Sequence, residues 1–251
     1  MQLKAKEALE AIDKILKKKK ISYYLLAGSA LGAIRHKDMI PWDDDIDIGI
    51  FFSDSDIVAA ALAEELPDEF EWIDKSNDIT YPRLHGKVLY HGYGVVDVFP
   101  LVKTSNSLIA QRIQWMERKI IHKLYKTKKY SLVRSFTTRK TIKNTVAEIL
   151  SKFISEDTLA KRLNKIVTRY ESIEQPIYYL NIFSIYSLRK ERINSKWITP
   201  GDHAEFGGNK YPVFSDCDSY LKNLYGNYMA LPPIEKRVPG HPEKYKDYQM
   251  T

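Results

Sequence analysis

The chain has 251 residues, 44% of them hydrophobic, which is enough for one large domain or two small ones with an apolar core. No apolar run approaches the roughly 18 residues of a transmembrane helix, and the basic N-terminus lacks the continuous apolar stretch of a secretory signal. The single cysteine, Cys217, excludes an internal disulfide, and no Cys/His cluster suggests zinc. We therefore expect a cytoplasmic protein.

The first predicted elements are a helix, a short strand and a second helix. Apolar residues at helical spacing predict an amphipathic helix over 3–20, and the apolar run Tyr23–Ala27 predicts a strand. Gly28 and Ser29 follow as a tight turn before a helix at 29–35. The first turn of a helix exposes unpaired N–H groups that attract phosphate. Although such a turn alone is common in loops, Gly28 and Ser29 form a candidate phosphate cradle here.

The next strand, over 45–52, follows three consecutive carboxylates, Asp43, Asp44 and Asp45. Because side chains alternate along a strand, Asp45 and Asp47 share one face while the intervening isoleucines point into the core. Oxygen ligands of this kind suit Mg²⁺ or Mn²⁺. A lone Asp-x-Asp is often a solvated strand face. Next to a phosphate cradle, however, it favours a metal site for phosphoryl or nucleotidyl transfer.

A helix ending near Leu66 and a strand at Phe70–Ile73 come next, followed by a hairpin formed from Tyr81–Tyr90 and Val95–Phe99. In the second strand of that hairpin, Asp97 lies between two valines. Burial of an ionised carboxylate is costly unless a metal or a partner compensates it. If this strand neighbours 45–52, Asp97 becomes a third metal ligand, and it could also accept a proton. The alternative is an aspartate paired with a buried arginine or backbone donors.

Three cationic or titratable side chains alternate on the first strand of the hairpin: Arg83, His85 and Lys87. Their shared face could line the pocket for the phosphate donor. The alternative is a solvated strand edge.

The middle of the chain is strongly basic and predicts helices over 106–130, 138–153 and 156–174. The segment 112–143 carries a net charge of +10, so the rest of the chain, at +7 overall, carries −3. An apolar stripe recurs every three or four residues in this segment: Ile109, Ile113, Met116, Ile120 and Leu124. Three alternatives remain open: the stripe packs on the core with the lysines in water, the region 109–143 binds an anionic membrane surface or lipid-linked acceptor, or it binds nucleic acid.

An apolar-aromatic stretch over 177–186 and a short helix over 216–225 complete the predicted elements. We expect three regions within one compact unit. These are a catalytic core over 1–105, a basic helical segment over 106–175, and a C-terminal segment over 176–251 that completes the active site and the acceptor region.

Three sequence blocks, taken in order, resemble one known family. The blocks read LAGSALGAIRHKDMIPWDDDIDIGIF, VVDVFPL and FGGNKYPVFSDCDSYLKNLYGNYMALPP. They resemble the LicD family of phosphotransferases, which includes the fukutin-type enzymes. The resemblance implies an α+β fold, with a nucleotidyltransferase-like mixed β-sheet flanked by helices. It also implies metal-dependent transfer of a substituted phosphate, such as phosphocholine, from a CDP-alcohol to a sugar hydroxyl of a surface glycan, capsule or teichoic-acid precursor, with release of CMP.

The resemblance also implies roles for individual residues. The metal ligands correspond to Asp45, Asp47 and Asp97, and the metal would be Mg²⁺ or Mn²⁺. The expected substrate-binding residues are Gly28, Ser29, Arg35, His36, Trp42 and Asp43, with Arg237 and His241 at the basic end of the last block. Asp97 or Asp44 is the expected catalytic base, and His36 is an alternative base or phosphate ligand. Ser29-Ala30 and Asp38 depart from the residues common in the family, but neither removes a group that the chemistry needs.

The donor would be of the CDP-choline, CDP-glycerol or CDP-ribitol type, and the acceptor a lipid-linked glycan reached from the cytoplasmic face of the membrane. A second enzyme hypothesis keeps the site but moves NMP from an NTP to a small molecule or protein. A nucleic-acid-binding protein with an inactive core is disfavoured, because the acidic run repels a phosphate backbone.

Overall fold

The fold is described by a computed structural model that covers residues 1–74, 85–133 and 142–238. Arg83 and His241, both expected to bind substrate, lie outside these residues.

The helices are α1 (Gln2–Lys18), α2 (Ala27–His36), α3 (Ser55–Glu65), α4 (Leu108–Val133), α5 (Ile142–Phe153), α6 (Glu156–Val167), α7 (Leu188–Glu191), α8 (Ser195–Ile198) and α9 (Cys217–Tyr225), with short 3-10 helices η1 (Phe52–Asp54), η2 (Thr168–Tyr170) and η3 (Ile234–Lys236). The strands are β1 (Tyr23–Leu25), β2 (Ile46–Phe51), β3 (Phe70–Ile73), β4 (Gly86–Tyr90), β5 (Tyr93–Lys103), β6 (Tyr178–Asn181), β7 (Arg192–Asn194), β8 (Asp202–Phe206) and β9 (Asn209–Val213).

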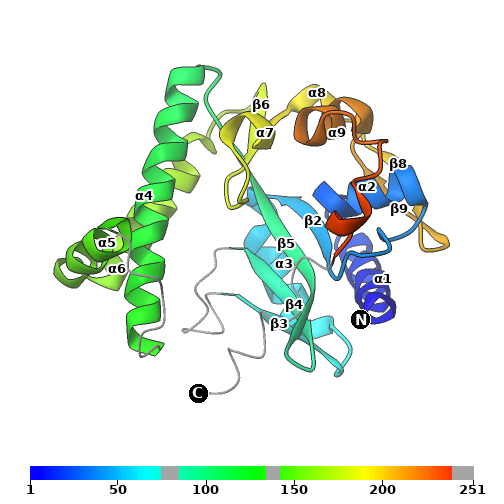
Figure 1. Cartoon of the computed structure of the whole chain (residues 1–251), viewed down its shortest axis with the longest axis horizontal. Helices are drawn as coiled ribbons and strands as arrows, with labels where there is room; N and C mark the ends of the chain where they lie inside the picture. Colours follow the sequence, from blue (N-terminus) through cyan, green and yellow to red (C-terminus); the bar gives the residue numbers. More distant parts are fainter. Residues whose placement is uncertain (75–84, 134–141, 239–251) are drawn as a thin grey trace.

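A mixed seven-stranded sheet forms the centre of the molecule (Figure 1). Its main path runs β1-β2-β5-β4-β3, and β6 and β7 extend it from the far end of β5. Only β2 and β5 pair in parallel; the other pairs of this sheet are antiparallel. The predicted mixed sheet flanked by helices is therefore confirmed.

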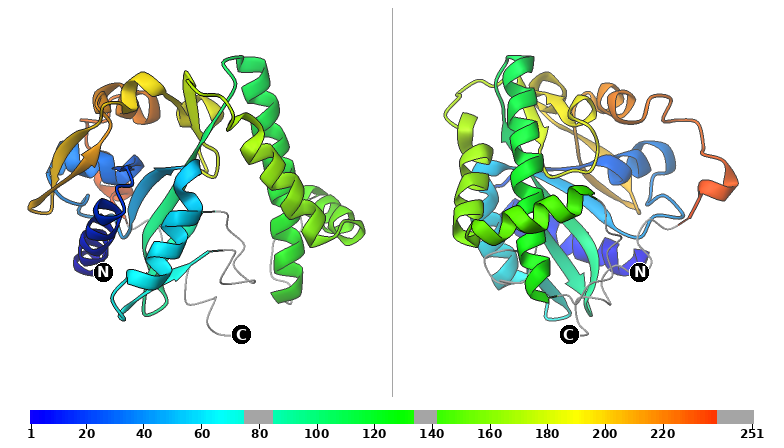
Figure 2. Two further views of the ribbon diagram at one scale, coloured as in Figure 1. Left: turned by 180° about the vertical axis from the view of Figure 1, so that it is seen from behind. Right: turned by 60° about the vertical axis from the view of Figure 1, so that its left-hand side comes forward.

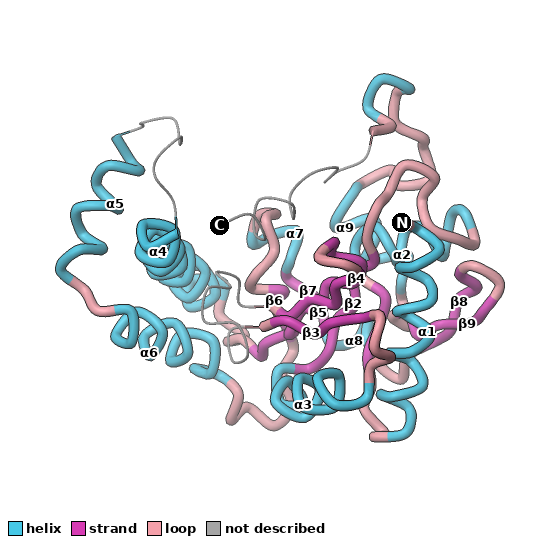
Figure 3. The backbone as a smooth tube through the Cα atoms, turned by 90° about the horizontal axis from the view of Figure 1, so that it is seen from below, coloured by secondary structure: helices cyan, strands magenta, loops and turns pink. Residues whose placement is uncertain are grey.

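The largest apolar core lies between the sheet and the helices that precede and follow its first strands. It takes Leu9, Ile12 and Leu16 from α1 and Ile46 and Ile48 from β2, all fully buried. The alternation of buried isoleucines and aspartates along β2 follows from the strand period of two. In Figure 3 the strands lie between α4–α6 on one side and α1 and α2 on the other. Asp47 therefore projects from a strand that is anchored in this core.

The predicted hairpin is confirmed, although its first strand begins at Gly86 within the described residues, and its second strand extends from Tyr93 to Lys103 rather than from Val95 to Phe99. β4 and β5 meet at a two-residue turn, in which His91 and Gly92 both have positive φ angles of 47° and 80°. Two successive residues of this conformation match the right-handed twist of paired strands. The strand at 70–73 and the helix near 216–225 are also confirmed, the latter to within one residue.

Helices α4, α5 and α6 form a separate layer at one end of the molecule, shown in green in Figures 1 and 2. α4 packs inward through Gln111, Gln114, Trp115 and Arg118, all of which are buried. Most of its apolar stripe faces outward, with these members exposed: Ile109, Ile113, Met116 and Ile120. The alternative in which this stripe packs on the core is therefore wrong for those four residues. It holds only for Leu124, which is buried against α5 and α6.

The described part of the chain contains no helix that is both long and apolar enough to cross a membrane.

Candidate active site

Two of the predicted metal ligands lie side by side on the parallel strand pair. In the β2–β5 register Asp47 is the partner of Asp97, and in the β4–β5 register Asp97 is the partner of Lys87. Partners across a sheet project from the same face. The sheet therefore places two carboxylates and one ammonium in a row across three strands. The expectation that the strands carrying Asp47 and Asp97 are neighbours is confirmed.

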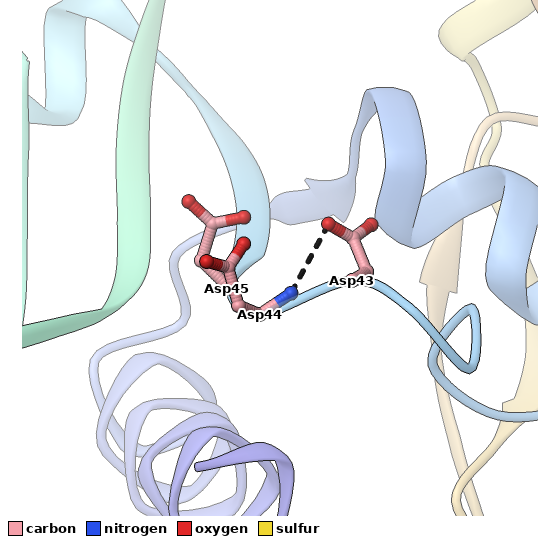
Figure 4. Close-up of side chains that lie close together, drawn as sticks. All are labelled: Asp43, Asp44 and Asp45. Atoms are coloured by element: carbon pink, nitrogen blue, oxygen red, sulfur yellow. Dashed lines mark hydrogen bonds between the residues drawn. The ribbon is translucent and has the colours of Figure 1, made fainter. Parts of the chain in front are cut away.

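A third carboxylate, that of Asp45, joins this row from the residue just before β2. Asp45, Asp47 and Asp97 each offer one oxygen, and these oxygens all lie within 4.8 Å of one another. A second group with the same spacing consists of Asp43, Asp44 and Asp45. Figure 4 shows this second group at the end of the loop that leads into β2, where the Asp44 N–H donates to Asp43 Oδ1 at 3.2 Å.

Burial and mutual repulsion make Asp43, Asp45 and Asp47 reluctant to ionise. Burial, followed by the negative charge of Asp97, raises the pKa of Asp45 to about 7. Burial and the charges of Asp45 and Asp97 raise the pKa of Asp47 well above its ordinary value. The pKa of Asp43 is raised to about 6, mainly by burial. A cation placed among these oxygens would relieve the repulsion, so the donor set fits a divalent cation that prefers oxygen ligands.

Asp97 differs from its neighbours because a lysine and a histidine contact it. Burial alone would raise its pKa, but the attraction of Lys87 and the hydrogen bond with His85 outweigh burial and hold the pKa of Asp97 below its usual range. The Lys87 ammonium forms an ion pair with Asp97 Oδ1, and His85 Nε2 lies 3.4 Å from Oδ2. His85 also stacks on Phe99, with ring centroids 4.5 Å apart. Asp97 is thus held as a permanent anion.

Both His85 and Lys87 are buried, and Lys87 is fully inaccessible to solvent. The alternative of a solvated strand edge is therefore wrong for these two residues. Their prediction as residues of the donor pocket stays a prediction, since their observed contacts are with Asp97.

The predicted phosphate cradle lies at the first turn of α2, which begins at Ala27, two residues earlier than expected. Ser29 Oγ accepts a hydrogen bond from the Asp47 N–H at 2.8 Å, so this hydroxyl joins α2 to β2. A Cβ at position 28 would lie 2.7 Å from Asp43 Oδ2, so a larger residue there would press against the end of the Asp43 side chain. The first turn of α2 therefore lies directly against the carboxylate cluster, with its N–H groups near it.

Arg35 and His36, at the end of α2, contact each other and the C-terminal segment. Arg35 Nη1 donates to the carbonyl oxygen of Tyr228 at 2.6 Å, and Arg35 Nε donates to His36 Nε2 at 3.0 Å. The His36 and Trp42 rings lie edge to face, 6.1 Å apart. The Arg237 guanidinium lies over the Trp42 ring at 5.5 Å. The structure thus brings these four predicted residues into one cluster, and their substrate contacts stay predictions.

Sequence reasoning missed several tyrosines beside the carboxylates. The Tyr220 hydroxyl accepts a hydrogen bond from the Ala27 N–H at 3.0 Å. Tyr186 and Tyr225 meet edge to face at 6.2 Å, and negative charge on Asp47 contributes to the raised pKa of both, after burial. Nothing local in the sequence distinguishes such residues from core tyrosines. Only the tertiary fold brings α9 and the segment before α7 to this place.

The same region of the chain matches a known family of domains. The family model described as "LicD/FKTN/FKRP, nucleotidyltransferase domain" matches residues 20–140, which include all the predicted metal ligands. The lipopolysaccharide cholinephosphotransferase LicD of Haemophilus influenzae is 25% identical over 96% of this chain and 94% of its own length.

Two human proteins match shorter segments. The ribitol 5-phosphate transferase FKRP is 43% identical over 49 residues, which is 20% of this chain and 10% of that protein. The ribitol-5-phosphate transferase FKTN is 35% identical over 81 residues, or 31% of this chain and 18% of that protein. Together with the family match and the near full-length relative, these similarities confirm the resemblance seen in the sequence: residues 20–140 of this chain belong to the LicD family.

Proposed function

We propose that this chain is a LicD-like phosphotransferase with a nucleotidyltransferase-like catalytic core. In the proposed reaction it transfers a substituted phosphate from a CDP-linked alcohol to a sugar hydroxyl of a glycan and releases CMP. The observation that carries the proposal is the convergence of Asp45, Asp47 and Asp97 within 4.8 Å, inside the region matched by the family model.

Asp45, Asp47 and Asp97 would hold Mg²⁺ or Mn²⁺ in this proposal. The raised pKa values of Asp45 and Asp47 support it, because these groups lack a positive charge sufficient to offset their repulsion. When bound, such an ion neutralises charge on the diphosphate and on the departing CMP. Lys87 forms its ion pair with Asp97, and its charge lowers the pKa of Asp45 and Asp47 by less than burial and the neighbouring carboxylates raise it.

The chain's own groups can then be given roles. The N–H groups of the first turn of α2, at Gly28 and Ser29, would bind phosphate oxygens of the donor. Their position beside Asp43 and Asp47 supports this assignment. Arg35, which closes α2, would remain engaged with Tyr228 and so hold the C-terminal segment over the site.

In the transfer step the acceptor hydroxyl oxygen forms a bond to the phosphorus that carries the alcohol, and the bond from that phosphorus to the CMP oxygen breaks. The hydroxyl proton must pass to a base. Of the two expected bases, Asp97 is poorly suited, because Lys87 and His85 keep its pKa low. Asp44 is half-buried in the same carboxylate cluster, and we assign it this role.

The class of substrate follows from the relatives. One is named for transfer of cholinephosphate to lipopolysaccharide and two for transfer of ribitol 5-phosphate. We infer a donor of the CDP-choline, CDP-ribitol or CDP-glycerol type and a glycan acceptor, lipid-linked at the inner face of the plasma membrane.

Incubation of the protein with these CDP-alcohols, Mg²⁺ and a panel of glycans, with CMP release as the readout, tests the proposal. We expect CMP release from one CDP-alcohol that depends on acceptor and stops in EDTA. Consumption of an NTP with release of pyrophosphate, and of no CDP-alcohol, would instead establish the alternative nucleotidyl transfer.

A further inference from the structure

One face of α4 combines exposed apolar and basic side chains. Ile109, Ile113, Met116 and Ile120 have exposed fractions of 70%, 50%, 61% and 58%. Successive helical residues advance by about 100°, so positions at this spacing form one continuous strip. Arg112 and Lys119 are exposed beside the strip. We name the six residues the α4 outer face.

The α4 outer face continues into a groove between α4 and α7. The groove has a volume of about 460 Å³, and four cations line it: Arg112 and Lys119 from α4, Arg189 from α7 and Arg192 from β7. Its described lining includes no acidic side chain, and Leu188 and Trp115 contribute apolar surface. This arrangement offers positive charge and apolar contact side by side.

The inner face of α4 is fixed by contacts with the rest of the described chain. The helix packs inward through Trp115, which lies with Val102 and Leu180 in a small apolar core, and through two buried glutamines, Gln111 and Gln114. Gln114 Nε2 donates to the Ile166 carbonyl oxygen at 2.9 Å, and its Oε1 accepts from the Thr104 hydroxyl at 2.8 Å. Because polar groups fix the inner face, the apolar strip remains turned outward.

We propose that the α4 outer face and the groove beside it dock the protein on an anionic phospholipid bilayer. The apolar strip would enter the boundary between headgroups and acyl chains, and the four cations would contact anionic headgroups. This is the binding mode of a helix that lies in the membrane surface, consistent with the absence of a membrane-spanning helix among the described residues.

The groove is also connected to the active site. α7 contacts α4 on one side and α9 on the other, and it lies between them in Figure 1. Tyr186, just before α7, is close enough to Asp47 and Asp43 for their charges to affect its pKa. Docking through this face would therefore hold the α7 side of the active site near the bilayer.

Vesicle binding itself needs neither donor nor acceptor, so its outcome is independent of the proposed transfer reaction.

Co-sedimentation of the full chain with vesicles tests the proposal. We expect binding to vesicles of phosphatidylcholine with about one-third phosphatidylglycerol, and little binding to phosphatidylcholine alone. The double variant Arg112→Glu/Lys119→Glu should lower the partition coefficient about ten-fold or more. Ile113→Ser/Ile120→Ser should lower it to a similar extent, because the apolar contact is lost.

Matched controls separate this surface from general charge and hydrophobicity. Arg162→Glu/Lys165→Glu changes the net charge equally on exposed positions of α6. Ile57→Ser/Ile149→Ser removes two isoleucines exposed by 54% and 51%, on α3 and α5. Both controls should bind as the wild type does. All variants change exposed residues, and circular dichroism verifies that they fold.

Equal loss of binding in the controls, equal binding to neutral vesicles, or no binding to either vesicle would overturn the proposal. A dimer in solution that Ile113→Ser/Ile120→Ser dissociates would also overturn it, since the face would then bind a second copy of the chain.

Discussion

At the scale of single residues, the buried ammonium of Lys87 separates the behaviour of Asp97 from that of Asp45 and Asp47. All three carboxylates are close together, and the Lys87 ammonium forms an ion pair with Asp97. The pKa values of the other two are raised, chiefly by burial. Lys87 therefore offsets one of the three carboxylates, and a divalent cation bound among them would offset the other two.

Replacement of Lys87 by methionine leaves the Asp97 carboxylate buried beside two others. We expect Lys87→Met to lower the free energy of unfolding by about 3–5 kcal/mol, the usual cost of removing one partner of a buried pair. The double variant Lys87→Met/Asp97→Asn should recover at least about half of this loss, because the stranded charge is removed too. Urea unfolding in EDTA measures both values. Additive losses in the double variant would show that the two residues are not coupled.

Replacement of Asp47 by asparagine removes a proposed metal ligand but keeps its shape. We expect Asp47→Asn to lower CMP release about 1000-fold, since several kcal/mol of charge stabilisation are lost. In EDTA at pH 8 its free energy of unfolding should rise by about 1 kcal/mol or more, because a buried carboxylate no longer has to ionise. Asp202→Asn, at an exposed position, is the matched control. Retained activity in Asp47→Asn would refute the assignment of this ligand.

At the scale of elements, α7 carries a buried carboxyl group that is not one of the proposed metal ligands. Glu191 is only 2% exposed and accepts a hydrogen bond from the Ser184 hydroxyl. Burial raises the pKa of Glu191 from its ordinary 4.5 to about 7. A carboxyl group whose pKa is raised by folding contributes stability below its unfolded pKa, and this contribution is lost as the pH rises through the folded pKa.

Glu191→Gln keeps a neutral hydrogen-bonding group at all pH values. We therefore expect this variant to be more stable than the wild type by about 1–3 kcal/mol at pH 8, with the difference shrinking towards pH 5. Urea unfolding at pH 5, 6, 7 and 8 measures it. A difference that does not change with pH would show that Glu191 ionises freely in the folded protein.

The orientation of α4 shows what sequence periodicity can and cannot predict. Spacing identified the helix and its apolar stripe, because a period of 3.6 residues is a local property. It did not predict which face turns inward, since that depends on partners far along the chain. Gln114, for example, is held by Thr104 and by Ile166 of α6. The exposed Ile109 and Ile120 became visible only with the fold.

At the scale of the whole molecule, the active site combines parts that are distant in sequence. The loop before β2 and the strands β2, β4 and β5 supply charged side chains, the first turn of α2 supplies N–H groups, and α9 and the segment before α7 add tyrosines. The C-terminal segment is anchored by Arg35. Binding chemistry is thus placed on rigid elements that a single large core holds together.

The convergence of Asp45, Asp47 and Asp97 could be predicted from the sequence, because alternation along two strands and one assumption about their pairing suffice. The capture of Asp97 by Lys87 could not be predicted, since it depends on β4 pairing with β5 in one register. The roles of Tyr186, Tyr220 and Tyr225 were likewise invisible, because no local spacing links α9 to α2.

Titration of the metal-free protein with Mn²⁺, followed by calorimetry, tests the central claim most directly. The account predicts saturable Mn²⁺ binding for which Mg²⁺ competes. Asp45→Asn and Asp47→Asn should each weaken this binding at least about ten-fold, and Asp202→Asn should leave it unchanged. Binding of equal strength in all four proteins, or no binding in the wild type, would contradict it.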